Sequence, residues 1–585
     1  MSGSTTARGG AALAAGAPLE AVLAAVAAEI GGPAFRVDGR TVDPVDIGGS
    51  TEPAGRPVTQ LGIELLGQVY ENLLASDDRR RRGAFFTPPE VADGLVGEVL
   101  SADGVPMGVV VDPACGAGAF LLAAGRRLVD LEAGVPATVA GNRLFGADID
   151  PLAVAVCRWS IAAWAGIGPD EVAGVVVGDS LRSGPSLWDD RPVGGFDAVV
   201  GNPPFLGQLR RGTARSAADR EVLRSVLGDL VRPYTDAAWL FLAAGVDLLA
   251  PGGRLALIQP QSVLAARDAA PVRAHVLAAG RLAGLWFDRS GVFAGRTEVC
   301  APIVERRSGG GPVRLLVDRQ VEPAGSASAP GPGEPWGAVV AELVGIPAVG
   351  VADVRQAGTQ SVGDLASVTA GFRQHFYGLV PGTTERAVGP AGGRPLVTTG
   401  LVDPLRCRWS ERPARFAGRR WEAPVVDEAA VAAADPSVGA WLADRHRPKL
   451  LVATQTRVVE VVVDETGEMV PVTPLVVVEP EPDDLWLLAA ALSAPPVTAL
   501  AARLTIGTAR SADRIKLTAG QVADLRLPAD EEAWCEGAGR ARDLCEAGGG
   551  ATAGAWMAFG SVMCVAYGVP EEPLLAWWWA RHPAH

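Results

Sequence analysis

The segment 109–120 of this sequence reads Val109-Val110-Val111-Asp112-Pro113-Ala114-Cys115-Gly116-Ala117-Gly118-Ala119-Phe120. The pattern predicts an apolar strand, a glycine-rich turn and the start of a helix. Gly116 and Gly118 allow a backbone to approach a ligand where a side chain would clash. Asp112, at the end of the strand, suits a cationic amino group. Because the full GxGxxG pattern is missing, the turn does not match a dinucleotide site.

Acidic residues also follow the next two apolar strands. The first of these segments reads Phe145-Gly146-Ala147-Asp148-Ile149-Asp150. We choose Asp148 as the acceptor of a ribose diol, because Asp150-Pro151 is typical of a helix N-cap and first turn. Ile149 could pack on an adenine face, and Asp179 could accept an adenine amino group. A helix cap or a surface loop is the alternative for each acid alone.

A stiff turn follows the fourth apolar strand and reads Asn202-Pro203-Pro204-Phe205. Two prolines after an asparagine cannot continue a sheet. The turn therefore holds a carboxamide, a backbone carbonyl and an aromatic ring at the carboxyl edge of the strand, where open α/β sheets bind ligands. Asn202 Oδ1 and the Pro203 carbonyl can accept the two hydrogens of an exocyclic amine, while Phe205 stacks on its ring.

Composition limits the class of protein. The chain has 585 residues, a hydrophobic content of 48% and a formal net charge of −14. This charge argues against a protein that coats nucleic acid nonspecifically, although it leaves room for a local basic groove. Seven cysteines without a CxxC pair indicate reduced thiols in a cytoplasm and no metal site. No apolar run is long enough for a transmembrane helix.

The composition and the hydrophobic pattern divide the chain into regions. The pattern of residues 1–60 predicts one helix and a loop. The pattern of residues 61–320 predicts a doubly wound, mostly parallel α/β domain with a helical lead-in. Its seven expected strands are 108–111, 144–147, 175–177, 196–200, 254–258, 284–287 and 299–304. Residues 321–335 have the composition of a linker. A second α+β domain is expected over 336–530 and a helical region over 531–585.

Together these segments resemble the γ class of N6-adenine DNA methyltransferases. The resemblance rests on three motifs in order, Gly83-Ala84-Phe85-Phe86-Thr87-Pro88, the segment 112–120 and the Asn-Pro-Pro-Phe turn. It covers residues 60–305 well and 336–530 loosely, as a target-recognition domain of type IIG and related restriction–modification enzymes. The resemblance implies a seven-stranded methyltransferase sheet, S-adenosylmethionine (SAM) as cofactor and duplex DNA as substrate.

By this resemblance, Thr87 and Pro88 lie against the methionine part of SAM, and Asp112, Gly116 and Gly118 line its amino-acid end. The rest of the cofactor segment is Pro113, Ala114, Cys115 and Phe120, followed by Asp148 for the ribose and by Ile149 and Asp179 for the adenine. The catalytic set is Asn202, Pro203, Pro204 and Phe205. DNA contacts are expected from Phe205, Phe293, Arg373, Arg447 and Lys449.

The same resemblance sets the expected partners. Residues 1–60 are too few for the N-terminal nuclease of type IIG relatives and contain no lysine, so the chain should methylate without cutting. A separate restriction or defence nuclease remains open as a partner. We expect a monomer in the cytoplasm, associated with the nucleoid. Two alternatives stay open, a methyltransferase acting on protein glutamine or RNA, and a non-catalytic DNA-specificity subunit.

Overall fold

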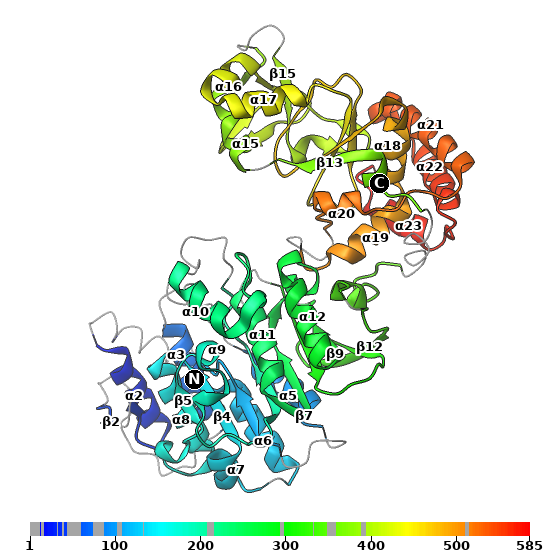
Figure 1. The fold of residues 1–585 in the computed structure, drawn as a ribbon. Helices are drawn as coiled ribbons and strands as arrows, with labels where there is room; N and C mark the ends of the chain where they lie inside the picture. The colour runs from blue at the N-terminus through cyan, green and yellow to red at the C-terminus, as the bar shows by residue number, and fades with distance from the viewer. Residues whose placement is uncertain are drawn as a thin grey trace. The chain divides into compact units, whose positions relative to one another are not determined.

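The computed structural model divides the chain into two compact units, Met1–Val340 and Ala341–His585 (Figure 1). The residues that it describes are 12, 17–31, 33–37, 40–43, 60–73, 87–101, 108–132, 134–206, 216–289, 291–292, 298–331, 333–347, 359–371, 373–387, 393–508 and 514–584.

The first unit is built on a ten-stranded sheet with the order β12-β11-β9-β10-β7-β6-β3-β4-β5, in which β8 pairs with β10. Its strands are β3 (Val110–Asp112), β4 (Leu144–Asp148), β5 (Val175–Val177), β6 (Phe196–Gly201), β7 (Leu249–Leu257), β8 (Gln259–Pro260), β9 (Arg281–Phe287), β10 (Val299–Glu305), β11 (Val313–Val317) and β12 (Glu322–Ala327).

The strand order places a topological switch point between β3 and β6. Strands β5, β4, β3, β6 and β7 pair in parallel, whereas β10 runs antiparallel to both β7 and β9. After β3, the chain forms β4 on one side of β3. It later forms β6 on the other side of β3. Crevices at such points are where open α/β sheets bind ligands.

Helices cover both faces of this sheet, because successive residues of a strand point to opposite faces. Ala198 and Val200 of β6 share one apolar cluster with α5 (Pro89–Val99), α6 (Ala119–Asp130) and α8 (Pro151–Ala165). On the other face, Gly245 of α11 (Ala237–Leu248) lies directly over Val199, Leu255 and Leu257. The expected α/β class is therefore correct.

The sheet differs from the prediction in size. Each of the seven expected strands overlaps one observed strand, and β8, β11 and β12 are additional. The linker predicted over 321–335 is wrong in part, since Glu322–Ala327 form β12, paired antiparallel with β11. This strand lies at the edge of the sheet with mostly exposed side chains. The side chains of β12 are mostly small or polar, in keeping with that exposure. The strand is held by backbone pairing with β11 and not by side-chain packing.

The amino-terminal helices join this unit. Helix α2 (Leu19–Ile30) and helix α3 (Gln60–Leu73) share a core cluster with α8, in which Val69 and Trp159 are fully buried. The Trp159 indole nitrogen donates a hydrogen bond to the carbonyl of Pro33 at 2.6 Å. The lead-in is therefore an integral part of the first unit.

The second unit holds two four-stranded sheets, ordered β13-β24-β21-β22 and β14-β20-β15-β23, and two hairpins, β16-β17 and β18-β19. The strands are β13 (Ala366–Ala370), β14 (Thr383–Glu385), β15 (Arg394–Val397), β16 (Val402–Asp403), β17 (Arg406–Cys407), β18 (Ala414–Phe416), β19 (Arg419–Trp421), β20 (Pro424–Val426), β21 (Lys449–Val452), β22 (Val461–Asp464), β23 (Val470–Pro471) and β24 (Val476–Pro480).

Helices of this unit include α15 (Arg373–Gly378), α16 (Glu428–Ala434), α17 (Pro436–Asp444), α18 (Leu485–Ser493), α19 (Pro495–Thr505), α20 (Ala519–Ala523), α21 (Glu531–Ala547), α22 (Ala553–Ala566) and α23 (Leu574–Arg581). Within the described part of the chain, no single helix has the length and apolar character to cross a membrane. The bent pair Pro482–Ser493 and Pro495–Thr505 meets that test on length and composition alone.

Candidate functional site

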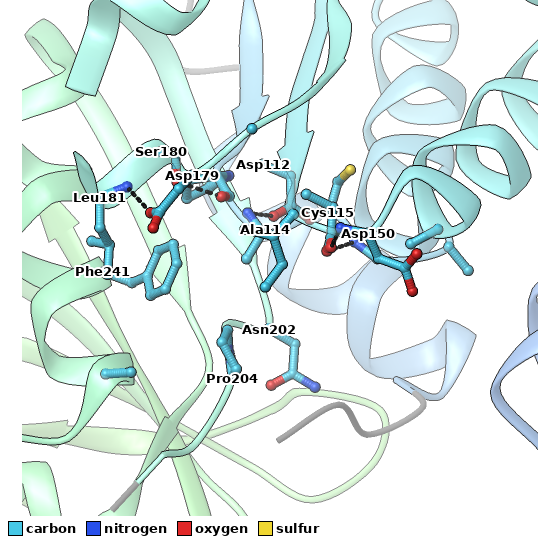
Figure 2. A pocket seen from close by; sticks show the side chains of 18 of the residues that line it. Asp112, Ala114, Cys115, Asp150, Asp179, Ser180, Leu181, Asn202, Pro204 and Phe241 are labelled. Carbon is cyan, nitrogen blue, oxygen red and sulfur yellow. Dashed lines mark hydrogen bonds between the residues drawn. The ribbon is translucent and has the colours of Figure 1, made fainter. Parts of the chain in front are cut away.

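A cavity of about 460 Å³ opens at the carboxyl ends of β3, β4, β5 and β6, at the switch point of the sheet. It brings together twelve of the residues predicted from the sequence, namely Thr87, Asp112, Pro113, Ala114, Cys115, Gly116, Phe120, Asp148, Ile149, Asp179, Asn202 and Pro204. Figure 2 shows Asp112, Asp179 and Asn202 around this shared space, although they come from different strands. Of the described residues predicted for the site, Pro88, Gly118, Pro203 and Phe205 are not part of the lining.

The two glycines of the turn have different roles. Gly116 has a left-handed φ of 49°, and a Cβ placed there would meet no atom within 4 Å. Its amide donates a hydrogen bond to Asp148 Oδ2 at 3.1 Å, so the open side of the turn faces the cavity. A Cβ on Gly118 would instead lie 2.7 Å from Cys157 Sγ of α8. Gly118 is not part of the cavity lining. Its lack of a side chain lets the start of α6 pack closely on α8, and its contact with a ligand stays a prediction.

Asp112 is the most deeply buried acid of the cavity, with 2% of its surface exposed. Burial raises the pKa of its carboxyl to about 8, against a smaller opposing effect from the hydrogen bond donated by the Ala114 amide. The carboxylate lies against Gly201 at the end of β6, where a Cβ would come within 2.4 Å of Asp112 Oδ1. A cationic ligand group would stabilise the ionised form of this acid.

Asp148 and Asp150 hold the neighbouring turn in place. The Asp150 amide donates to Asp148 Oδ1 at 2.9 Å. Asp150 caps α8 by accepting from the Leu152 amide at 3.1 Å, as its Asp-Pro sequence predicts. Its other oxygen accepts from the Tyr70 hydroxyl at 2.7 Å. Asp148 is thus fixed by backbone donors at the mouth of the cavity.

Helix α3 supplies two lining residues that the sequence did not single out, Tyr70 and Glu71. The contact between Tyr70 and Asp150 joins residues 80 positions apart. The helical spacing of apolar residues in α3 predicts the helix, but carries no information on which element it packs against. Only the tertiary fold identifies these two residues.

The far end of the cavity combines an apolar surface with a capped helix. Ile149 is 69% exposed, which is unusual for a large apolar side chain beside a buried strand. Asp179 accepts from the Leu181 and Arg182 amides and so caps the short helix Ser180–Ser183, while Arg182 pairs with it at 3.0 Å. Asp179 therefore both caps this helix and lines the cavity.

Asn202 extends from the turn after β6 into the same cavity. Its amide nitrogen donates to Thr87 Oγ1 at 3.1 Å, and Thr87 is 5% exposed. Figure 2 shows the amide oxygen of Asn202 on the side of Pro204 and the nitrogen on the opposite side. Thr87 therefore contacts the asparagine that the sequence placed at the reacting centre, in addition to lining the cavity.

The rest of the turn is anchored on both sides. The Leu206 amide donates to Asp236 Oδ1 at 3.1 Å, and Asp236 also caps α11 through the Ala238 amide. Phe205 is half-buried and packs against the cluster shared by α5, α6 and α8. Asp236 and Phe241 of α11, the latter in the lining, were not predicted. The turn is thus held by groups from distant parts of the chain.

The residues predicted to contact DNA have mixed outcomes. Lys449 is fully buried, and its ammonium binds Asp464 Oδ2 at 2.6 Å and the carbonyls of Arg445 and Gly467 at 2.9 Å, so its prediction as a DNA contact is wrong. Arg447 pairs with Asp444 at 2.6 Å. Phe293 and the side chain of Arg373 lie outside the described residues. None of these four residues gives structural support for a DNA contact.

The part of the chain that forms the cavity is similar to known proteins. The family model for N-6 DNA methylase matches residues 62–296. The methylase subunit of the type I restriction enzyme EcoEI from Escherichia coli is 26% identical over 204 residues, which cover 34% of this chain and 37% of that protein. The adenine-specific methyltransferase PglX of Streptomyces coelicolor is 29% identical over 213 residues, covering 27% of this chain and 17% of that protein.

A likeness of fold extends further along the chain. The solved structure of the type IIL restriction–modification enzyme MmeI in complex with DNA aligns with a TM-score of 0.58 and 13% identity, covering 92% of this chain and 82% of that one. The chain spans well under half the length of the two curated relatives. Residues 62–296, which match the N-6 DNA methylase model, include the whole cavity lining.

Proposed function

We propose that the chain transfers a methyl group from SAM to N6 of an adenine that has swung out of duplex DNA, at a specific sequence and within a restriction–modification or phage-defence system. The observation that carries the proposal is the meeting of two turns in one cavity, the glycine turn after β3 and the Asn-Pro-Pro turn after β6. The first suits a cofactor and the second suits an exocyclic amine, and parallel pairing of their strands places them side by side.

The residues on the cofactor side fit SAM in their chemistry. The buried Asp112 carboxyl is suited to the amino group of the methionine part, Asp148 to the ribose hydroxyls, and the exposed Ile149 to the adenine face. When bound, SAM supplies a methyl group on a positively charged sulfur, which makes that methyl an electrophile. The cavity volume of about 460 Å³ lies within the usual range for small-molecule sites.

On the amine side, the chain holds acceptors for both amine hydrogens. The lone pair of the adenine amine is delocalised into the ring, so the amine is a weak nucleophile. Hydrogen bonds to Asn202 Oδ1 and the Pro203 carbonyl would favour a nitrogen with a localised lone pair. Thr87 accepts from the Asn202 amide nitrogen and so favours the orientation in which the oxygen faces the amine. Positioning of this kind can contribute about 7–11 kcal/mol to the lowering of a barrier.

The amine cannot be reached inside a duplex, so we propose that the base leaves the stack. Extrusion costs a few kcal/mol, and stacking on an aromatic side chain recovers about 1–3 kcal/mol per base. Phe205 is the proposed platform, with Phe293 as a second candidate. Recognition of the DNA sequence is assigned to the second unit, and the enzyme would act in the cytoplasm, where the chromosome lies. A separate nuclease as partner remains part of this proposal.

The test is incorporation of labelled methyl from SAM into duplex DNA, duplex RNA and protein offered separately. We expect label at N6 of adenine in DNA alone. The variant Asn202→Ala should lose incorporation yet bind SAM with an affinity close to that of the unmodified chain, because Asn202 faces the amine and not the cofactor. Label in protein glutamine or RNA would support the first alternative. SAM binding without incorporation into any substrate would support a non-catalytic subunit.

A further inference from the structure

The hairpin β18-β19 of the second unit presents arginines on a rigid support. Its strands Ala414–Phe416 and Arg419–Trp421 pair antiparallel, and Ala417 and Gly418 form the tight connection with φ of 49° and 77°. Two central residues with positive φ match the right-handed twist of the strands they join. Phe416 is 1% and Trp421 7% exposed, so the hairpin is anchored in the apolar core of the unit.

The anchoring contacts are specific. The Trp421 indole nitrogen donates to the Phe416 carbonyl at 3.1 Å. The Phe416 ring meets Phe376 edge-to-face with ring centres 4.9 Å apart. These buried side chains restrain the backbone of the hairpin. The residues that face outward from it are therefore presented on a rigid support.

The arginine-rich stretch 406–420 separates into two groups in the structure. Arg406 pairs with Glu411 at 2.7 Å, Arg412 pairs with Asp403 at 3.0 Å, and Arg408 lies near both acids. Each arginine of this first group therefore has an ion pair. The second group, Arg415, Arg419 and Arg420, is exposed on the hairpin.

The charges of the second group are poorly balanced. Arg415 and Arg420 lie directly opposite each other across the two strands, an arrangement of like charges that destabilises a hairpin. Arg420 has a single exposed ion pair, with Glu422 at 3.3 Å, and such pairs contribute little. Among the described residues, Arg415 and Arg419 have no ion pair. Arg419 stacks over the Trp421 ring at 4.6 Å, which fixes its guanidinium plane.

A further exposed arginine lies next to the hairpin. The Arg386 amide donates to the Ala423 carbonyl at 2.9 Å, two positions after the end of β19. Its guanidinium lies over the Trp409 ring at 5.2 Å. Both Glu385 oxygens accept backbone amides of residues 422 and 423. Among the described residues, Arg415 and Arg419 thus carry charges that no ion pair balances, in a chain whose net charge is −14.

We propose that the β18-β19 hairpin binds the phosphate backbone of duplex DNA through Arg415 and Arg420, which share one face of the hairpin. The proposal rests on the proposed function, and it names the surface by which the second unit holds its substrate. Arginine presents a planar set of donors that matches a phosphate oxygen pair, and a phosphate between Arg415 and Arg420 would remove the repulsion between them.

The experiment measures binding of the full chain to a labelled DNA duplex at several salt concentrations. Each phosphate contact contributes about 0.9 to the slope of log affinity against log salt. The double variant Arg415→Ala/Arg420→Ala should therefore lower the slope by about 1–2 and weaken binding about tenfold or more at low salt. Arg415→Lys/Arg420→Lys keeps both charges and should retain the slope.

The matched control is Arg540→Ala/Arg542→Ala, which removes one half-buried and one exposed arginine of α21 from the same unit. An unchanged slope in the hairpin variant, or an equal loss in the control, would overturn the proposal. Equal competition by duplex RNA would also contradict it. Thermal melting and SAM binding show that each variant is folded. If Arg415→Ala/Arg420→Ala did not fold, Arg415→Gln/Arg420→Gln would be measured in its place.

The two proposals fail separately. Absence of methyl incorporation by the unmodified chain would contradict the proposed function, even if the hairpin variant changed the salt slope. Conversely, a chain that methylates adenine and whose hairpin variant binds DNA normally would keep its function and lose only this surface.

Discussion

At the scale of single residues, the contact between Thr87 and Asn202 joins the two halves of the site. The Asn202 amide donates to Thr87 Oγ1 at 3.1 Å across 115 positions of sequence. The amide can serve the proposed chemistry only with its oxygen turned to the amine, and a hydroxyl acceptor on its nitrogen favours that orientation. Thr87 is therefore a positioning residue in the proposed reaction.

Replacing Thr87 by Val keeps the shape of the side chain and removes the acceptor. We expect kcat to fall by about 10–100-fold, in line with about 1–3 kcal/mol for an unsatisfied polar group, while Thr87→Ser restores most of the rate. Single-turnover methylation would measure this. Asn202→Asp keeps an acceptor oxygen and removes the amide nitrogen that Thr87 accepts from. Since Thr87 acts through that nitrogen, Thr87→Val/Asn202→Asp should be no slower than Asn202→Asp, and additive losses would contradict the assignment.

Asp112 gives a pH-dependent prediction. Its folded-state pKa of about 8 lies above the ordinary value of 3.8 because of burial, so the folded chain retains a proton that the unfolded chain loses. Between pH 4 and 8 this acid makes stability fall as pH rises. Asp112→Asn should therefore be more stable than the unmodified chain at pH 8, and the difference should vanish near pH 4, as urea unfolding would measure.

The same substitution should cost SAM affinity. A cationic amino group beside Asp112 favours the ionised carboxyl, so SAM binding near pH 7 should release a proton. Calorimetry in buffers with different ionisation enthalpies counts that proton. A variant Asp112→Asn that binds SAM with unchanged affinity and proton count would contradict the role given to this acid.

At the scale of elements, Lys449 shows how strand pairing decides the role of a charge. Lys449 of β21 lies directly opposite Asp464 of β22, and both are buried. Asp464 also accepts from the Met469 amide at 2.8 Å. The ion pair therefore lies between the open ends of a strand pair in the core of the second unit. The buried Lys449 ammonium cannot contact a polyanion.

Lys449→Met keeps the length of the side chain and removes its charge. Because it leaves the Asp464 carboxylate buried without its partner, we expect the second unit to lose about 3–5 kcal/mol of stability. Chemical unfolding followed through tryptophan fluorescence would measure the loss. Arg447→Ala is the comparison, and its exposed pair with Asp444 should contribute about 1 kcal/mol or less.

The elements that could be predicted from the sequence are those encoded by residues close to one another along the chain. The strands from β3 to β7 carry short apolar runs bounded by glycine, proline or acids, and their helix caps are encoded within three residues, as at Asp150. The exposed edge strand β12 has no such run. The partners of Lys449 and Asp236 lie 15 and 30 residues away, and no local pattern encodes that pairing.

At the scale of the whole molecule, the two units differ in how far the sequence could describe them. The first unit follows a regular alternation of strand and helix, so its α/β class and most of its cavity were predictable. The second unit combines two small sheets with hairpins, and in the order β13-β24-β21-β22 the strand β13 pairs with β24, which is distant in sequence. Its general α+β character is visible in the sequence, but the ion pairs of its arginines are decided by the tertiary fold.

Gly201 has no side chain, yet its small size is required beside the cavity. A Cβ at this position would lie 2.4 Å from Asp112 Oδ1, so only glycine leaves room for the Asp112 carboxylate at the start of the Asn-Pro-Pro turn. In the proposed reaction, a larger residue at 201 would displace the acid assigned to the cofactor. Mutational tolerance at this glycine should follow the catalytic residues, although it has no functional group to contribute.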